Sequence, residues 1–125
     1  MNGGEIHSYR DLKVWQLAMD LAEACYHLTR RFPTEEKYGM TSQIRRAAVS
    51  VPANIAEGHG RNSRGEYVQF LRVAQGSLKE LETHILLARR IDLIDARGES
   101  GILERCDVLE KMLRALIRSL QAGRE

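Results

Sequence analysis

Residues 67–88 have the sequence YVQFLRVAQGSLKELETHILLA, and this stretch decides the fold. Ser63, followed three residues later by Glu66, matches a capping box and predicts where the helix begins. The apolar residues of the stretch are alternately four and three positions apart, which places them along one side of an α-helix that packs against a long neighbour. They are Tyr67, Leu71, Ala74, Leu78, Leu81, Ile85 and Ala88.

Two further helices are predicted before this stretch. The first spans residues 11–31 and ends before a proline, which restricts the backbone of the residue that precedes it. The second spans residues 40–58, with Thr41 or Ser42 as its cap. Pro52 lies inside this second pattern and removes one backbone hydrogen bond, so we expect a kinked helix there rather than two separate helices.

A last helix is predicted after a loop at residues 95–101. Helices of about 20 residues are about 30 Å long, and short connections make sequential helices antiparallel. We therefore predict an all-α protein with an up-down-up-down antiparallel four-helix bundle, formed by one domain over residues 10–122 and preceded by a flexible N-terminus at residues 1–9. The apolar residues of the last helix again recur at intervals of three and four: Ile102, Cys106, Leu109, Leu113, Leu116 and Leu120.

Composition limits the class of protein. The 125 residues include 19 Lys and Arg against 17 Asp and Glu, a net charge of +2, and are 43% hydrophobic, which excludes a disordered chain. No apolar run approaches the roughly 20 residues that cross a bilayer, so we expect no membrane partner. Cys25 and Cys106 lie on apolar helical stripes, and residues 1–8 lack the apolar core of a secretory signal. Both features favour a soluble, cytoplasmic protein.

The first helix carries more apolar surface than a lone bundle requires. Its two apolar stripes span roughly 200°, whereas an arc of a little over 100° suffices. We predict that the second stripe, Leu12, Trp15, Met19 and Tyr26, forms an oligomer interface. The alternative is that Trp15 and Tyr26 cover the bundle and pack against its own loops. Gly76 costs about 1 kcal/mol relative to Ala in a helix, which predicts close approach by another backbone.

Several sequence strings together resemble a known family. The chain is similar, over roughly residues 9–120, to four-helix-bundle proteins first found in intervening sequences of bacterial 23S ribosomal RNA genes. The resemblance implies a ring-like homo-oligomer, a pentamer, in the bacterial cytoplasm, and it implies no known reaction. The strings are DL at 11–12, VWQ at 14–16, YG at 38–39, QIRRA at 43–47, SVPANIAEG at 50–58 and GSLKELE at 76–82.

That family is similar in fold to the accessory protein of diversity-generating retroelements. This accessory protein is a basic pentamer that associates with a reverse transcriptase and with nucleic acid. The likeness is one of fold, and fold alone does not determine function. It makes a reverse transcriptase or a ribosomal component a candidate partner.

A polar row lies beside the apolar one on the second helix. One interpretation is a structural network in which Arg46 and Glu57 pair with Glu80 or Lys79 on a neighbouring helix, because buried charges must be paired. The row, with members three or four positions apart, consists of Gln43, Arg46, Ser50, Asn54 and Glu57.

The other interpretation is a nucleic-acid-binding surface. Five copies at +2 each would carry about +10, and they could arrange basic loops into a band that matches a phosphate backbone. Tyr67 is the one aromatic residue interleaved with these arginines, so we expect binding to the backbone of RNA or DNA with little base stacking. The segment 41–65 contains a single acid and four arginines: Arg45, Arg46, Arg61 and Arg64.

No pattern in the sequence indicates catalysis, a metal or a cofactor. Glu23 with His27 and Glu80 with His84 are four residues apart, which suits surface pairs rather than the Glu-x-x-His spacing of di-iron bundles. The cysteines fall on core stripes, and no serine has a convincing base beside it. We predict a non-enzymatic, self-associating accessory factor that binds nucleic acid. The alternative is a protein-protein interaction scaffold in which the same arginines hold subunits together.

Overall fold

A computed structural model describes residues 6–123 of the chain. Within this range every regular element is helical, and no strand is present. The elements are the 3-10 turn η1 (Tyr9–Asp11), α1 (Lys13–Thr29), the 3-10 turn η2 (Thr34–Glu36), α2 (Met40–His59), α3 (Arg64–Arg90) and α4 (Ala96–Gln121).

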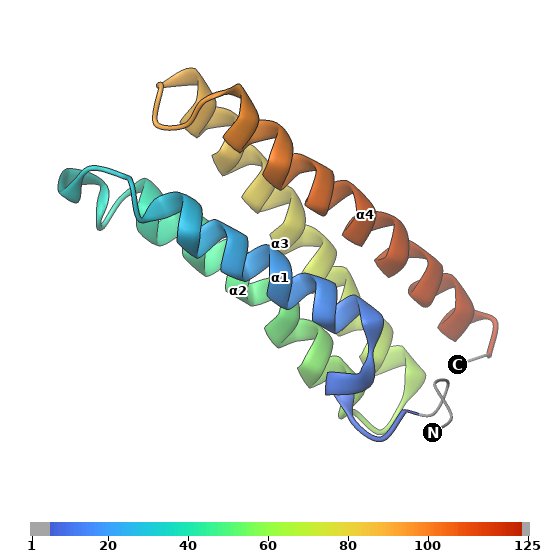
Figure 1. The fold of residues 1–125 in the computed structure, drawn as a ribbon. Helices are drawn as coiled ribbons and strands as arrows, with labels where there is room; N and C mark the ends of the chain where they lie inside the picture. Colours follow the sequence, from blue (N-terminus) through green and yellow to red (C-terminus); the bar gives the residue numbers. More distant parts are fainter. Residues whose placement is uncertain (1–5, 124–125) are drawn as a thin grey trace.

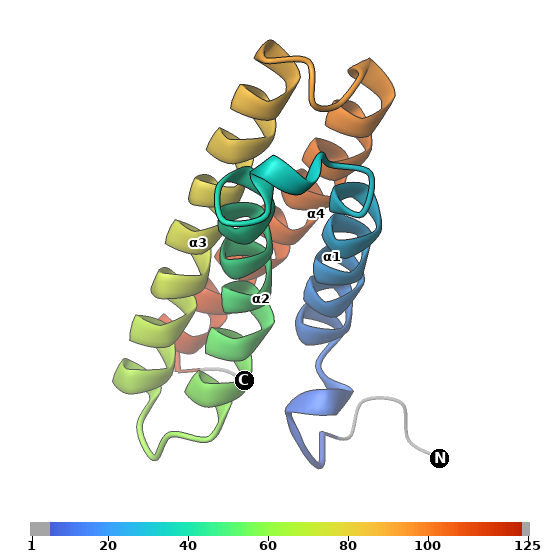
Figure 2. The same ribbon diagram turned by 90° about the vertical axis from the view of Figure 1, so that its left-hand side faces the viewer.

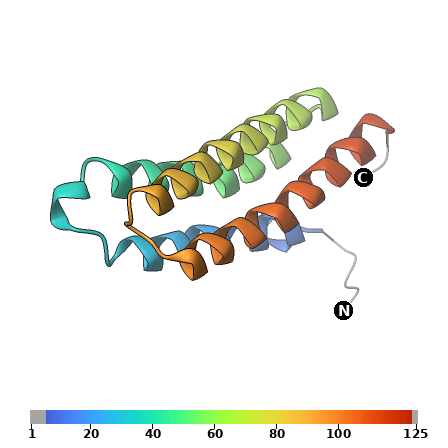
Figure 3. The same cartoon turned by 90° about the horizontal axis from the view of Figure 1, so that it is seen from above.

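The four long helices run alternately up and down, and each packs against the next one along the chain (Figure 1). α1 also packs against α4, so α1 and α3 stand diagonally across the bundle. Seen from above, α2 and α3 lie on one side and α1 and α4 on the other (Figure 3). η2 and the α3–α4 connection share one end, and η1 and the α2–α3 connection share the other (Figure 2). The predicted antiparallel four-helix bundle is confirmed.

Side-chain caps explain where two of the helices begin. The hydroxyl of Ser63 accepts a hydrogen bond from the amide of Glu66 at 3.1 Å, as predicted for the start of α3. The carboxylate of Asp95 accepts one from the amide of Gly98 at 2.8 Å, and α4 begins at Ala96. The prediction of a loop over 95–101 was therefore wrong, because the aspartate cap outweighs the low helix propensity of the glycines.

α2 begins differently from the prediction. Its N-cap is Gly39, without a side-chain cap from Thr41 or Ser42. Instead the carboxylate of Glu36 accepts a hydrogen bond from the amide of Met40 at 3.1 Å, so an acid from η2 satisfies one of the free amides at this end. α2 then continues as one helix through the buried Pro52.

The core runs along the centre of the bundle. All seven members of the predicted stripe on α3 are buried. On α4 the prediction of Leu116 was wrong, because Ile117 is buried and Leu116 only partly so. A strict alternation of four and three averages 3.5 residues, so the stripe would drift slowly around a helix of 3.6 residues per turn. The two successive intervals of four, from Leu109 to Leu113 and from Leu113 to Ile117, correct this drift and keep the stripe facing the core.

The described part of the predicted flexible N-terminus holds a turn. Residues 1–5 lie outside the described range. Ser8 accepts a hydrogen bond from the amide of Arg10 at 3.1 Å, and the carboxylate of Asp11 accepts one from the amide of Ser8 at 3.2 Å. Within residues 6–123, no helix combines the length and the apolar character needed to cross a bilayer.

Two glycines in the helices have opposite surroundings. A Cβ on Gly58 would lie 2.7 Å from Cβ of Phe70 and 3.1 Å from Cδ1 of Tyr67, so α2 and α3 approach closely at this corner. A Cβ on Gly76 would meet no heavy atom of the described residues within 4 Å. The close backbone approach predicted for Gly76 is therefore not made within this part of the chain.

These surroundings predict opposite effects of alanine at the two sites. Gly58→Ala should lower the free energy of unfolding by about 1–3 kcal/mol because the corner is already full. Gly76→Ala should raise it by up to about 1 kcal/mol because alanine is the better helix former. Urea denaturation followed by circular dichroism measures both. Equal effects of the two substitutions would contradict the packing described for the corner.

Candidate nucleic-acid interface

The four arginines of the predicted binding surface occupy two separate places. Arg45 and Arg46 lie in the first half of α2, whereas Arg61 lies in the α2–α3 connection and Arg64 begins α3. Most of the length of α2 separates the two pairs, which at 1.5 Å per residue is on the order of 20 Å. The structure therefore does not bring the four side chains together.

The pair at the α2–α3 connection is held by contacts within the chain. Nη2 of Arg61 donates a hydrogen bond to the carboxylate of Glu57 at 2.7 Å, and its guanidinium lies 4.7 Å from the ring centroid of Phe70. Nη2 of Arg64 donates to the carbonyl oxygen of Gly123 at 3.2 Å. Glu57 thus pairs with an arginine of the connection that follows its helix rather than across to α3 as predicted.

Part of the predicted polar network links α2 to α3. The hydroxyls of Ser50 and Ser77 are hydrogen-bonded at 2.8 Å, and Nδ2 of Asn54 donates to the carbonyl and the hydroxyl oxygen of Ser50 at 2.8 and 3.0 Å. Glu80 instead contacts His84 on its own helix at 3.3 Å, and Gln43 is exposed. The polar row is structural at its centre and open to solvent towards the beginning of α2.

Arg45 fastens the end of α1 to α2. Its Nε donates to the hydroxyl of the buried Thr29 at 2.8 Å, and its Nη2 approaches the carbonyl oxygen of Tyr26 at 3.4 Å. The guanidinium also lies 4.4 Å from the centroid of the Tyr26 ring. A cation is favourable at this place because the carbonyl groups at the C-terminal end of a helix carry partial negative charge.

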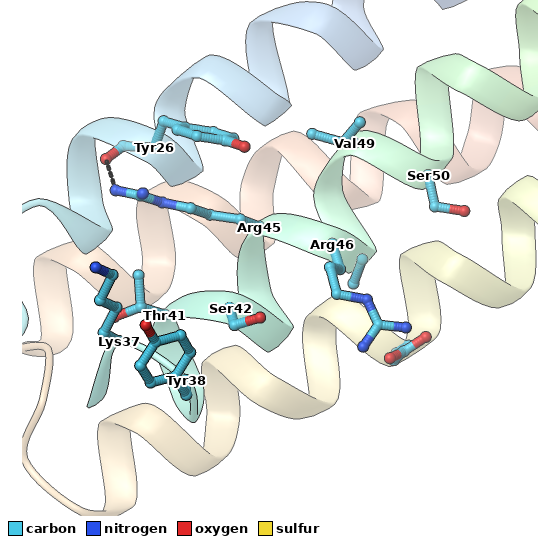
Figure 4. Close-up of a pocket in the computed structure, with 11 residues that line it drawn as sticks. Tyr26, Lys37, Tyr38, Thr41, Ser42, Arg45, Arg46, Val49 and Ser50 are labelled. Atoms are coloured by element: carbon cyan, nitrogen blue, oxygen red, sulfur yellow. Dashed lines mark hydrogen bonds between the residues drawn. The ribbon is translucent and has the colours of Figure 1, made fainter. Parts of the chain in front are cut away.

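A surface hollow of about 720 Å³ lies over this first half of α2 (Figure 4). Within it Arg45 reaches back to Tyr26, whereas Arg46 points the other way, towards α3. Three cationic side chains, Lys37, Arg45 and Arg46, line the hollow together with one acid, Glu80. We call this feature the basic hollow; its lining comprises Tyr26, Lys37, Tyr38, Thr41, Ser42, Arg45, Arg46, Ala47, Val49, Ser50 and Glu80.

Comparison with known proteins identifies the family. Residues 10–115 match the family described as 23S rRNA-intervening sequence protein. The chain belongs to this family. A crystal structure of a protein of unknown function from the S23 ribosomal protein family, from Bacteroides thetaiotaomicron, has the same fold, with a TM-score of 0.75 at 23% identity. The likeness covers 83% of this chain and 97% of that one. No curated protein matches the chain.

The basic hollow of this intervening-sequence protein is lined by two aromatic side chains that the sequence pattern did not indicate. Tyr26 and Tyr38 lie beside the arginines, although neither belongs to the segment 41–65. Tyr67, the aromatic residue singled out from the sequence, is only 6% exposed and packs in the core. The prediction that Tyr67 was the one aromatic neighbour was wrong, because Tyr26 comes from another helix and Tyr38 from the turn before α2.

The predicted oligomer interface of the intervening-sequence protein divides into two kinds of residue. Leu12 and Trp15 are partly buried against the core, and the ring of Tyr9 meets Trp15 edge-on with centroids 5.2 Å apart. Met19 is 45% exposed, and Tyr26, although exposed, lies beneath Arg45. Trp15 is thus contacted by a turn of its own chain, whereas Met19 is not covered by the core.

The two cysteines of the intervening-sequence protein are fully buried free thiols. Burial raises the pKa of Cys25 to about 12. Burial also raises the pKa of Cys106 to about 12, with smaller contributions from the charges of Glu82 and Cys25. A nucleophilic cysteine needs an accessible thiolate near neutral pH. These thiols are therefore structural.

The raised pKa of both thiols predicts a pH dependence of stability. The folded protein keeps each thiol protonated to about pH 12, whereas the unfolded chain releases the proton near pH 9. The contribution of each thiol to the free energy of unfolding is fully present below pH 9. Above pH 9 this contribution falls by about 1.4 kcal/mol for each thiol and each pH unit. In urea unfolding between pH 8 and pH 10.5, the double variant C25A/C106A should therefore lose less stability with rising pH than the unmodified protein. Parallel pH curves for the two proteins would contradict this.

Proposed function

We propose that this protein is a non-catalytic helical bundle that binds the phosphate backbone of a nucleic acid through the basic hollow. The observation that carries the proposal is the charge available there. The side chains of Lys37 and Arg46 line the hollow and form no ion pair or hydrogen bond with another residue in the range 6–123. The one acid that lines it is Glu80, which also contacts Nε2 of His84 at 3.3 Å.

Arginine and lysine side chains of this kind bind phosphate by charge and by hydrogen bonding. A guanidinium offers a planar fork of donors that matches two phosphate oxygens, and an ammonium acts as a compact point charge. Arg45 adds a third positive charge, although its Nε is already used by Thr29. The hydroxyls of Thr41 and Ser42 supply further hydrogen-bonding groups at the same surface.

Charge reversal separates this surface from the arginines at the α2–α3 connection. Arg46→Glu should weaken binding of RNA at about 50 mM salt at least tenfold, and it should reduce the slope of log K against log salt by about one. Arg61→Glu is the matched control, and it should change affinity much less because Glu57 already offsets that charge. Fluorescence anisotropy at several salt concentrations measures both. Equal losses from the two variants would place the binding surface elsewhere.

A second candidate function is self-association into a ring, and the distribution of exposed apolar residues favours it. Val73 and Leu87 lie on the outer face of α3, on either side of the open Gly76, and Ile91 directly follows the helix; all three are exposed. Met19 is exposed on α1, diagonally across the bundle. A closed ring of more than two copies needs two different surfaces on each copy, because its contacts are head-to-tail.

This arrangement predicts the behaviour of two charged variants. Met19→Glu and Leu87→Glu should each dissociate the assembly, because each removes one half of the same head-to-tail contact. Sedimentation velocity at micromolar concentration measures the effect, with Val108→Glu on α4 as a matched exposed control. An unmodified protein that sediments as a single chain would contradict the ring. Dissociation by only one of the two variants would indicate a two-fold contact instead.

A further inference from the structure

We infer that the nucleic acid bound in the basic hollow is single-stranded, and that Tyr38 is the platform on which one of its bases stacks. The inference rests on the proposed function and specifies its ligand. Tyr38 is 88% exposed, the highest exposure of any large hydrophobic residue in the described part of the chain. Its ring therefore contributes little to the core.

The faces of the other tyrosine rings singled out above are covered by the protein itself. Tyr67 is buried, and the guanidinium of Arg45 lies over the ring of Tyr26. Tyr38 differs because its described ring contact is Nζ of Lys37, at 5.5 Å from the centroid. An open ring beside available cations is the combination that binds single strands, since a base stacks on the ring while cations hold the backbone.

The spacing along the chain fits a short piece of one strand. Tyr38 lies just before α2 begins, and Arg46 lies six residues after Met40. Six residues of helix correspond to a rise of about 9 Å. Stacked nucleotides advance about 3.4 Å each along one strand, so the rise of α2 from Met40 to Arg46 corresponds to about two or three nucleotides. Figure 4 shows both side chains within the same hollow, with Lys37 next to Tyr38.

A duplex cannot use this arrangement without being opened. The flat faces of paired bases are covered by their neighbours, and unstacking one costs a few kcal/mol. A duplex would therefore contact only Lys37, Arg45 and Arg46, whereas a single strand would contact these cations and Tyr38 as well. Stacking tolerates any base, so preference among sequences should be weak.

The test measures the affinity of the full chain for labelled single strands of uridylate and of thymidylate, and for a duplex of equal length. Single strands should bind more tightly than the duplex. Tyr38→Ala should weaken single-strand binding by about 5- to 100-fold and leave duplex binding unchanged, as expected for one stacked base. Tyr38→Phe should retain the affinity of the unmodified protein. Tyr38→Leu, which keeps an apolar side chain without a π face, should behave like the alanine variant.

The possible outcomes separate this inference from the function on which it rests. The inference is overturned if Tyr38→Ala changes neither affinity, or both equally, while Arg46→Glu weakens both; backbone binding then stands alone. Absence of salt-dependent binding to any strand overturns the proposed function and the inference together. Because Tyr38 is exposed, circular dichroism and the urea midpoint of its variants should match those of the unmodified protein. Comparison of uridylate with thymidylate shows whether the sugar 2′-hydroxyl contributes.

Discussion

The close antiparallel packing of α2 on α3 is the constraint on which the rest of the molecule depends. At one end, Gly58 allows the side chains of Tyr67 and Phe70 to reach the backbone of α2. Near the middle, the short side chains of Ser50 and Ser77 meet in a hydrogen bond between the helices. With this face of α2 fixed against α3, the arginines flanking its outer surface must diverge. Arg45 is directed to α1 and Arg46 to the side of α3, and the basic hollow forms between them.

The intrachain partners of the arginines decide which charges a phosphate can use. An exposed pair such as Arg61 with Glu57, four residues apart, contributes only about 0.3–0.5 kcal/mol to stability, so it is easily broken. The carboxylate nevertheless stays nearby and offsets the attraction that Arg61 exerts on an approaching phosphate. The side chains of Lys37 and Arg46 form no ion pair within residues 6–123, and the three cations of the hollow, Arg45 included, outnumber its one acid, Glu80. The availability of a charge therefore matters more here than the number of arginines in a segment.

The sequence predicted the helices well and the site poorly, for a physical reason. Burial of an apolar stripe is a local, periodic signal, so it located four helices and every buried residue of α3 except Val68. It placed Leu116 rather than Ile117 in the core because a strict alternation of four and three drifts from 3.6 residues per turn. It also missed helix starts that depend on single side chains, such as the Asp95 cap of α4 and the carboxylate of Glu36 at α2. The basic hollow combines three separate segments of the chain. No spacing along the sequence indicates that Tyr26 and Tyr38 would lie beside Arg45.

Self-association and nucleic-acid binding are coupled if both occur in this protein. A head-to-tail ring repeats the basic hollow at a fixed interval, so a strand held in one copy is presented to the next at a high effective concentration. A single hollow offers few phosphate contacts, and its affinity alone would be modest at physiological salt. Repetition multiplies these contacts, and the salt dependence of the assembly should rise in proportion to the number of hollows that one strand occupies. A variant that dissociates the ring would then lose affinity although every residue of its hollow is intact, whereas a variant in the hollow would lose affinity without dissociating. Loss of affinity in a dissociated variant with an intact hollow distinguishes binding by the repeated surface from weak binding by single chains, for which dissociation alone would leave the affinity unchanged.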